Sequence, residues 1–265
     1  MDSDPRKWIA TLRSSHERLS GLVAQLTPEQ LRAQSYDTEW TNAQVLSHIG
    51  SGAEIAMTML PAALGEAGPP DSGAFQAVWD RWNAKSPDEQ AADVLPADEK
   101  YVRALEQLSD EQLAGVAFPF FGMQLDAVGL IRLRLSEHAL HTWDIAVFFD
   151  PAAAVAAGAV ELLVDQVPQF LAPRLAKPQD PAVRARITTT GPERDYLIAA
   201  GPDAVAMSDW AGAGPAEAAG AGELAMPAEA LLRLAYGRLD PGHTPESVTG
   251  SPELLGRLRA VFPGF

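Results

Sequence analysis

The stretch Glu137-His138-Ala139-Leu140-His141-Thr142-Trp143-Asp144 lies in a segment whose apolar spacing predicts a helix. Glu137 and His141 are four positions apart, so on a helix their side chains share one face, with Cβ atoms about 5–6 Å apart. One carboxylate and one imidazole at that spacing can hold a single divalent metal ion, which needs a third protein ligand. His48 lies far upstream in a second apolar helical segment. We therefore expect a metal centre at His48, Glu137 and His141.

Two simpler explanations compete with this prediction. A glutamate and a histidine at this spacing are commonly a surface or capping pair, and a histidine in an apolar helix is commonly a satisfied core residue. The surrounding sequence favours the metal, because a charged glutamate is costly to bury unless it is paired or bound to an ion. We expect Glu137 to be buried and His48 to point inward, since the helix around Glu137 has an apolar face marked by Leu133, Leu140, Ile145 and Phe148.

The types of ligand limit the choice of metal but do not identify it. Two histidines and one carboxylate form a known set for a divalent ion that keeps open coordination positions. Zinc is the first choice, and iron(II), manganese and nickel remain compatible with these ligand types.

The remaining histidines are weaker ligand candidates. His138 projects about 100° away from Glu137 around the helix, so we expect it in solvent, with contact to a metal ligand as the alternative. His16 lies in a polar stretch and is predicted to be on the surface. His243 follows Gly237 and Arg238 in a predicted loop, and its environment is ambiguous.

Composition excludes several classes of function. The chain has 265 residues, nearly half of them hydrophobic, and a formal net charge of −15. This charge argues against nucleic-acid partners and against docking on anionic membranes. The sequence contains no cysteine, so disulfides, a cysteine nucleophile and thiolate ligands from the chain are excluded. The polar N-terminus and the lack of a membrane-length apolar run predict a cytoplasmic protein with no membrane partner.

Helical periodicity dominates the first two thirds of the chain. We expect helices over residues 4–26, 41–64 (capped by Thr41), 75–82, 88–108 (interrupted at Pro96), 126–150 and 155–171. Four long helices before residue 175 favour a four-helix bundle over residues 1–175. The apolar stretch 118–123 is predicted to be a loop, either a pocket wall or lid or, with slightly more weight, a buried crossover.

The composition changes after a proline-rich linker at residues 173–181. Residues 183–190 alternate as a strand does, and further strands are expected at 196–200, 204–207 and 222–226. Helices are expected at 227–236 and 252–262. Residues 182–265 therefore read as a smaller α+β domain, which makes the fold class α plus α+β.

Two segments resemble a known family. Residues 40–48, Trp-Thr-Asn-Ala-Gln-Val-Leu-Ser-His, resemble the W-t-x-x-x-V-l-x-H stretch of DinB-like bundle proteins, and residues 137–144 resemble their E-x-x-x-H-x-W-D stretch. The separation of about 90 residues also suits that family. Residues 228–238 and 248–255 resemble the extra C-terminal domain of the mycothiol-dependent maleylpyruvate isomerase group. The resemblance covers nearly the whole chain.

The resemblance implies a DinB-like bundle in which His48, Glu137 and His141 bind zinc and a low-molecular-weight thiol, mycothiol, takes the open position. It also implies that Arg238 holds an acidic substrate. Trp40 and His243 are the further residues that we assign to the thiol and substrate side. Without the resemblance, a surface cap at the end of its helix is an equally good explanation for Arg238.

The chemistry is consistent with this family. Metal coordination lowers the pKa of a thiol, and a chain without cysteine must take that thiol from outside. We expect an enzyme, a monomer or small homo-oligomer, that isomerises or S-conjugates a small electrophile. The alternatives are a metal hydrolase that activates water and a non-catalytic protein that binds a thiol conjugate or another small ligand.

Overall fold

A computed structural model describes residues 3–120, 123–214 and 219–264 of the chain. The chain divides into two compact units, with the boundary between Ala153 and Ala154. The first unit is helical apart from a short hairpin, and the second combines helices with a sheet. The expected fold class, a helical bundle followed by a smaller α+β unit, is confirmed.

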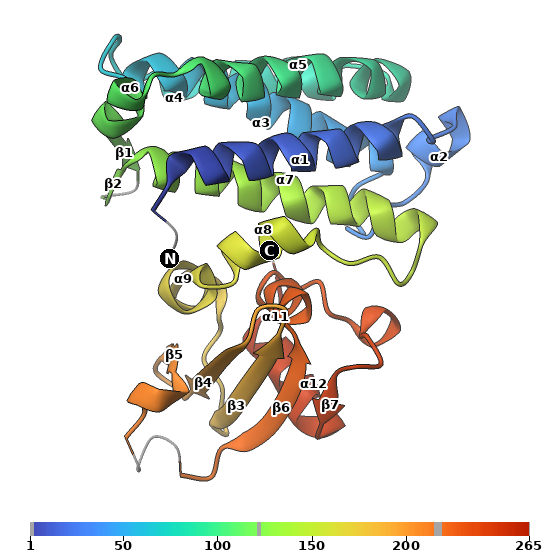
Figure 1. Cartoon of the computed structure of the whole chain (residues 1–265). Coiled ribbons are helices and arrows are strands. Elements are labelled where there is room, and N and C mark those ends of the chain that lie inside the picture. Colours follow the sequence, from blue (N-terminus) through green and yellow to red (C-terminus); the bar gives the residue numbers. More distant parts are fainter. Residues whose placement is uncertain (1–2, 121–122, 215–218, 265) are drawn as a thin grey trace. The chain divides into compact units, whose positions relative to one another are not determined.

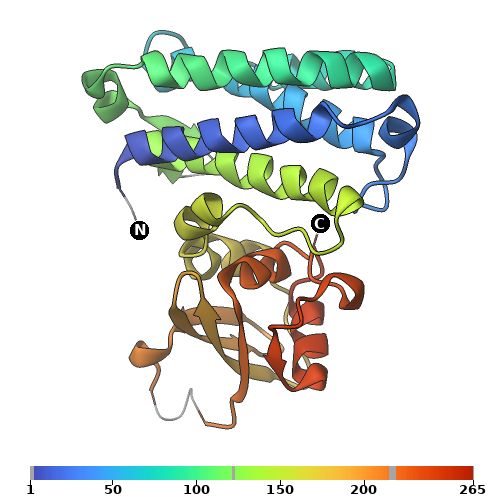
Figure 2. The same ribbon diagram turned by 45° about the vertical axis from the view of Figure 1, so that its right-hand side comes forward.

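Four long helices form the framework of the first unit (Figures 1 and 2). They are α1 (Pro5–Val23), α3 (Asn42–Ala63), α5 (Pro87–Gln107) and α7 (Ala127–Phe149), joined by the shorter α2 (Pro28–Arg32), α4 (Ser72–Asn83) and α6 (Asp110–Gly115). Helix α1 packs against α5 and α7, and α3 packs against α4, α5 and α7. This packing places α3 beside α7, the two helices that carry the predicted metal ligands.

Local sequence fixes where these two helices begin. Thr41 and Gln44 form a capping box at the start of α3, each side chain bonding the backbone N–H of the other residue. At the start of α7 the side chain of Asp126 accepts a hydrogen bond from the backbone N–H of Gly129 at 2.7 Å. The expected helix starts at Thr41 and Asp126 are confirmed.

The core around α3 explains the orientation of His48. Val45, Leu46 and Ile49 are buried in one cluster with residues of α1, α5 and α7. His48 lies on a different side of the helix and keeps 34% of its side chain exposed. His48 thus points toward Glu137 and His141 of α7 and is partly buried, so the expectation that it points inward holds in part, and its apolar neighbours take the core positions.

Two expectations about irregular backbone in this unit, an interrupted helix and a loop, are wrong. Helix α5 runs through Pro96 without interruption, since its packing along α3 outweighs the one hydrogen bond that proline removes. The predicted apolar loop at 118–123 overlaps β1 (Phe118–Phe120) and the start of β2 (Met123–Leu125), an antiparallel pair in which the buried Phe118 and Leu125 are partners. Phe121 and Gly122, within the predicted loop, lie outside the described residues.

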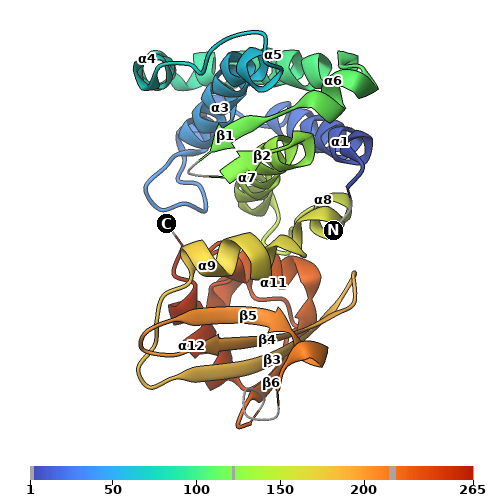
Figure 3. The ribbon, with the colours of Figure 1, turned by 90° about the vertical axis from the view of Figure 1, so that its left-hand side faces the viewer.

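The second unit is built on a five-stranded sheet with the order β5-β4-β3-β6-β7, most of which Figure 3 shows face-on. Strands β3 and β6 are parallel neighbours and the other pairs are antiparallel. The strands are β3 (Val183–Thr190), β4 (Arg194–Ala200), β5 (Val205–Asp209), β6 (Gly222–Pro227) and β7 (Thr249–Gly250), with α11 (Ala228–Ala235) and α12 (Pro252–Val261) between and after them. Alternate residues of β3 are buried, as its sequence predicts.

The segment between the bundle and the sheet differs from expectation. The predicted helix over 155–171 is divided into α8 (Ala157–Leu163) and a π-helical turn η1 (Val167–Leu171), which is followed by α9 (Ala172–Leu175). Pro168 lies in the first turn of η1, and it lacks the N–H that would continue an α-helical ladder. These elements contact α11 and β5, so residues that we expected in the bundle belong to the C-terminal unit.

Candidate metal centre

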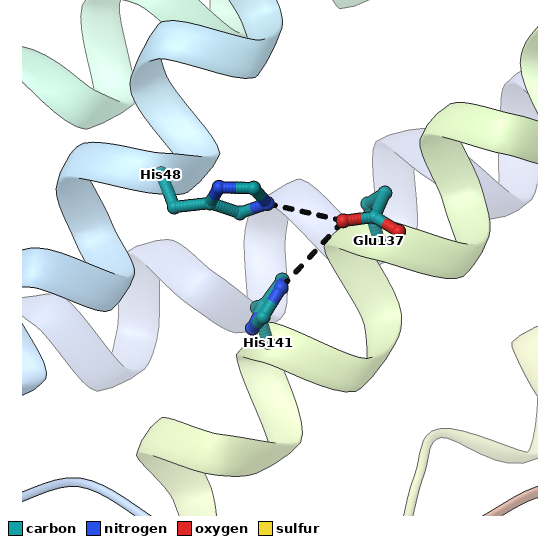
Figure 4. A group of neighbouring side chains, drawn as sticks. All are labelled: His48, Glu137 and His141. Carbon is teal, nitrogen blue, oxygen red and sulfur yellow. Dashed lines mark hydrogen bonds and ion pairs between the residues drawn. The ribbon is translucent and has the colours of Figure 1, made fainter. Parts of the chain in front are cut away.

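Helices α3 and α7 bring the three predicted ligands together (Figure 4). Nε2 of His48 lies 3.0 Å from Oε2 of Glu137, and Nε2 of His141 lies 3.6 Å from the same oxygen. One ligand atom from each of the three residues lies within 4.8 Å of the others. Zinc bound at 2.0–2.2 Å in a tetrahedral site holds its ligands about 3.3–3.6 Å apart. The three side chains therefore fit a divalent ion after small adjustments.

The site is more open than the sequence predicts. Glu137 keeps 46% of its side chain exposed, so the expectation that it is buried is wrong. Leu133, on the same helical face one turn earlier, is itself only partly buried. Partial burial raises the pKa of the Glu137 carboxyl, but hydrogen bonds and charge interactions with His141 and His48 outweigh it and lower that pKa. Glu137 is thus a carboxylate at neutral pH, the form that binds metals.

Asp144 orients one of the ligands. Nδ1 of His141 donates a hydrogen bond to Oδ2 of Asp144 at 2.8 Å, and the Asp144 carboxylate is fully buried. With the proton on Nδ1, Nε2 of His141 is the nitrogen left for a metal, and a carboxylate partner also makes it a more basic ligand. Asp144 is a site residue that we did not predict, although its spacing of three residues from His141 on a helix is a signal for this contact.

We expect Asp144→Ala to weaken zinc binding by about 10- to 100-fold, the usual effect of removing a carboxylate behind a metal-bound histidine. A chelator competition titration measures this change. Asp150→Ala is the matched control, because Asp150 caps the end of the same helix and bonds only the local backbone there. Equal zinc affinity in the two variants would contradict the role of Asp144.

Trp40 packs beside the two histidines of the centre. The centroid of its ring system lies 5.0 Å from the ring of His48 and 5.8 Å from the ring of His141. The carbonyl of Trp40 accepts hydrogen bonds from both the backbone N–H and the hydroxyl of Ser35. Trp40, which we assigned to thiol and substrate binding, therefore lies next to the candidate centre on an anchored segment.

A buried polar cluster joins α1, α5 and α7. Oδ2 of Asp98 accepts hydrogen bonds from Nδ1 of His16 at 2.8 Å and Nε2 of His138 at 2.9 Å, and Oδ1 accepts one from Arg134 at 2.6 Å. Ser15 bonds the other ring nitrogen of His138. Both histidines are buried, so the expectations that His138 is solvated and His16 is on the surface are wrong.

Asp98 and Arg134 form the ion pair of this cluster, and the two histidines add hydrogen bonds to Asp98. Burial would raise the pKa of Asp98, but His138 and Arg134 lower it well below its usual value. Burial also lowers the pKa of His138 despite the neighbouring carboxylate, which keeps that imidazole neutral near pH 7. No local pattern in the sequence pairs Asp98 on α5 with residues of α1 and α7, so sequence reasoning missed the cluster.

The remaining predicted site residues lie in the C-terminal unit. Arg238 follows α11 and is 8% exposed, with Nη1 donating to the carbonyl of Tyr236 at 3.2 Å. It is thus a buried residue at the helix end rather than the surface cap considered as the alternative. His243 lies in the 3-10 turn η3 (Pro241–His243), where Nδ1 donates to Asp240 at 2.8 Å. Roles for Arg238 and His243 in thiol and substrate binding remain predictions.

Fold and site together define a helical-bundle protein with a candidate divalent-metal centre and a C-terminal α+β unit. The family model described as "Mycothiol maleylpyruvate isomerase N-terminal domain" matches residues 12–146. The chain belongs to this mycothiol maleylpyruvate isomerase family.

Two solved structures resemble the whole chain. One is a crystal structure of the mycothiol-dependent maleylpyruvate isomerase, 15% identical, with a TM-score of 0.66 over 94% of this chain and 93% of that one. The other is a histidine-to-alanine mutant of that isomerase, 14% identical, with the same TM-score and coverage. At this identity the similarity establishes the fold. No curated protein matches the sequence. In the part of the chain that the structure describes, no helix is both long and apolar enough to cross a membrane.

Proposed function

We propose that this chain is an enzyme that uses a metal-activated external thiol, mycothiol, to isomerise or S-conjugate a small electrophile. The observation that carries the proposal is the meeting of His48, Glu137 and His141 at one point in a chain of the mycothiol maleylpyruvate isomerase family. Zinc is the metal that we propose, because two histidines and a carboxylate are a common catalytic zinc set that leaves one position open.

Each residue of the centre has a separate task in this proposal. His48, Glu137 and His141 would hold the ion, and Asp144 keeps Nε2 of His141 available by fixing the proton on Nδ1. A bound divalent ion lowers the pKa of a coordinated thiol, so that a thiolate is present at neutral pH. Trp40 lies against both imidazoles and offers an apolar surface to the thiol or the substrate. The chain has no cysteine, so the sulfur comes from the cosubstrate.

Isomerisation and conjugation share their first step. The thiolate sulfur forms a bond to one carbon of an activated double bond, and the electron pair of that double bond moves to the activating carbonyl. The former double bond is then a single bond and rotates. Return of the electron pair with cleavage of the C–S bond gives the isomer, whereas protonation of the carbon with retention of sulfur gives the conjugate. We further propose that Arg238 binds an acidic group of the substrate through its planar guanidinium, with His243 beside it on the same segment.

Calorimetric titration with mycothiol, with and without zinc, tests the proposal. We expect one zinc ion per chain and thiol binding only to the zinc-loaded protein, with release of about one proton per thiol bound because the thiol ionises. S-methyl mycothiol, which has no proton to lose, is the control and is expected to bind without proton release.

Three results would contradict the proposal. A zinc content of only a small fraction of one ion per chain would contradict the proposed metal centre. Equal thiol binding with and without zinc would contradict activation of the thiol by the metal and would favour water as the activated group. Thiol binding without consumption of any offered electrophile would support the non-catalytic binding protein instead.

A further inference from the structure

Arg134 is the member of the buried polar cluster that projects from α7 on nearly the same side as His141. It is on α7, one helical turn before Glu137, and it faces within about 20° of His141 around the helix axis. On α3, Gly52 lies one turn after His48, and the guanidinium of Arg134 reaches it. A Cβ atom at position 52 would lie 2.9 Å from Nη1 of Arg134. Gly52, which Nη1 approaches, is thus about one helical turn, or roughly 5.4 Å, along α3 from His48.

The hydrogen bonds of Arg134 leave part of its guanidinium unused. Nη2 donates to Oδ1 of Asp98 at 2.6 Å and to the carbonyl of Ile49 at 3.0 Å. Nε is buried and has no partner. Among the residues that the structure describes, none accepts a hydrogen bond from Nη1 either. The side chain is only 6% exposed, so this cation is held in place while its Nη1 donors stay available.

We propose that Nη1 of Arg134 binds a carboxylate of the substrate and so forms an anion subsite beside the metal centre. The inference deepens the proposed function and rests on it for the position of the substrate. A separation of about one helical turn suits a short unsaturated acid whose reacting carbon lies near the metal ligands and whose carboxylate reaches Arg134. A hydrogen bond between guanidinium and carboxylate is charge-assisted and among the stronger kinds.

Asp98 pairs with Arg134 through Nη2 and leaves the Nη1 end of this cation unused. The chain carries a net charge of −15, so its surface as a whole repels a carboxylate. Asp98 already accepts hydrogen bonds from His16 and His138 as well as from Arg134, and it faces Nη2 rather than Nη1. Nη1 therefore offers cationic donors that a carboxylate could bind without displacing Asp98.

Gly52 keeps this space open. It is a helical residue of α3, where alanine has the higher intrinsic helix propensity, yet a methyl group there would press against Nη1. Because the clash is with the far end of a side chain and not with backbone, Gly52→Ala is expected to shift Nη1 while leaving the helix intact. The substitution thus acts on Nη1 while leaving Arg134 and Asp98 in the chain.

Maleate, a small cis-dicarboxylate, is the probe for this subsite. The zinc-loaded full chain is titrated with maleate by calorimetry in the absence of thiol, so that only binding is measured. We expect Gly52→Ala and Arg134→Lys to weaken maleate binding by about tenfold, because each removes the Nη1 contact. Gly21→Ala is the matched control: it is also a helical glycine, on α1, and its Cβ would meet no heavy atom within 4 Å. It is expected to change maleate affinity by less than about twofold.

Two further measurements separate the outcomes. Dimethyl maleate, which carries no charge, is expected to bind all variants alike, and zinc content is measured for each protein. Equal maleate affinity in Gly52→Ala, Arg134→Lys and Gly21→Ala would overturn the subsite and leave the proposed function intact. Absence of zinc binding would overturn the proposed function, whereas weaker maleate binding by Gly52→Ala in metal-free protein would still support the subsite. Should Gly52→Ala fail to fold, Arg134→Lys against Gly21→Ala decides the question.

Discussion

His48→Ala is expected to lower zinc affinity by at least about a hundredfold and to abolish thiol-dependent turnover. The substitution leaves only Glu137 and His141, two ligands on one helix, and removes the single ligand from α3. Structural zinc sites with four ligands bind with about 10–16 kcal/mol in total, so one ligand accounts for several kcal/mol. Zinc content after dialysis, together with chelator competition, measures the loss.

A neighbouring substitution on α3 provides the control for His48→Ala. Thr58 is exposed on the same helix, and its hydroxyl bonds only the carbonyl of Glu54 one turn earlier. Thr58→Ala is expected to keep one zinc per chain and full activity. A His48→Ala protein that retained stoichiometric zinc would show that the metal, if bound, is held elsewhere.

Asp98→Ala is expected to destabilise the bundle unit by about 3–5 kcal/mol, the usual cost of removing one partner from a buried ion pair. Asp98 has no exposed surface and accepts hydrogen bonds from Arg134, His16 and His138. Its removal leaves the guanidinium of Arg134 buried without a counter-charge. Because small domains are stable by only about 5–15 kcal/mol, this loss is a large share of the total. Chemical denaturation at pH 7 measures it.

The control for this prediction lies on the same helix. Glu106 pairs with Arg13 near the surface, and surface pairs contribute about 0–1 kcal/mol. Glu106→Ala is therefore expected to cost less than about 1 kcal/mol. Similar losses in Glu106→Ala and Asp98→Ala would contradict the importance of the buried cluster.

Lowering the pH should remove the contribution of Asp98 to the free energy of unfolding. Its pKa in the folded state is held well below the ordinary value, so the unfolded chain takes up the proton first as the pH falls. The contribution of Asp98 is fully present above the unfolded pKa of about 3.9 and is lost as the pH falls toward the folded pKa. The stability difference between the wild-type protein and Asp98→Asn is therefore expected to be largest near neutral pH and to shrink below about pH 4.

Local signals allowed much of this structure to be predicted. The start of α3 at Thr41 and the strand Val183–Thr190 follow from a capping residue and from strict alternation, both of which act over a few residues. The proximity of Glu137 and His141 follows from helical spacing. That His48 meets them depends on the packing of α3 against α7, and the sequence pointed to it only through the two family motifs.

The errors have a common physical cause, because each concerns contacts between distant segments. His138 and His16 are buried because Asp98, on another helix, satisfies both. Glu137 is exposed because burial depends on which neighbours cover a helical face, and Leu133 beside it is only partly covered. The break in the helix predicted over 155–171 reflects contacts with β5 and α11, which helical periodicity alone does not contain.

The proposed ligands are also far apart along the chain, and this has a thermodynamic consequence. His48 and Glu137 are separated by 89 positions, so an ion held by both acts as a reversible cross-link that closes a long loop. Closing a loop of this length removes conformational freedom from the unfolded chain and favours the folded one. An ion that binds only the folded state adds about 1.4 kcal/mol of stability for each tenfold rise in free ion above the dissociation constant. The folded population of the bundle would then depend on the supply of metal in its surroundings.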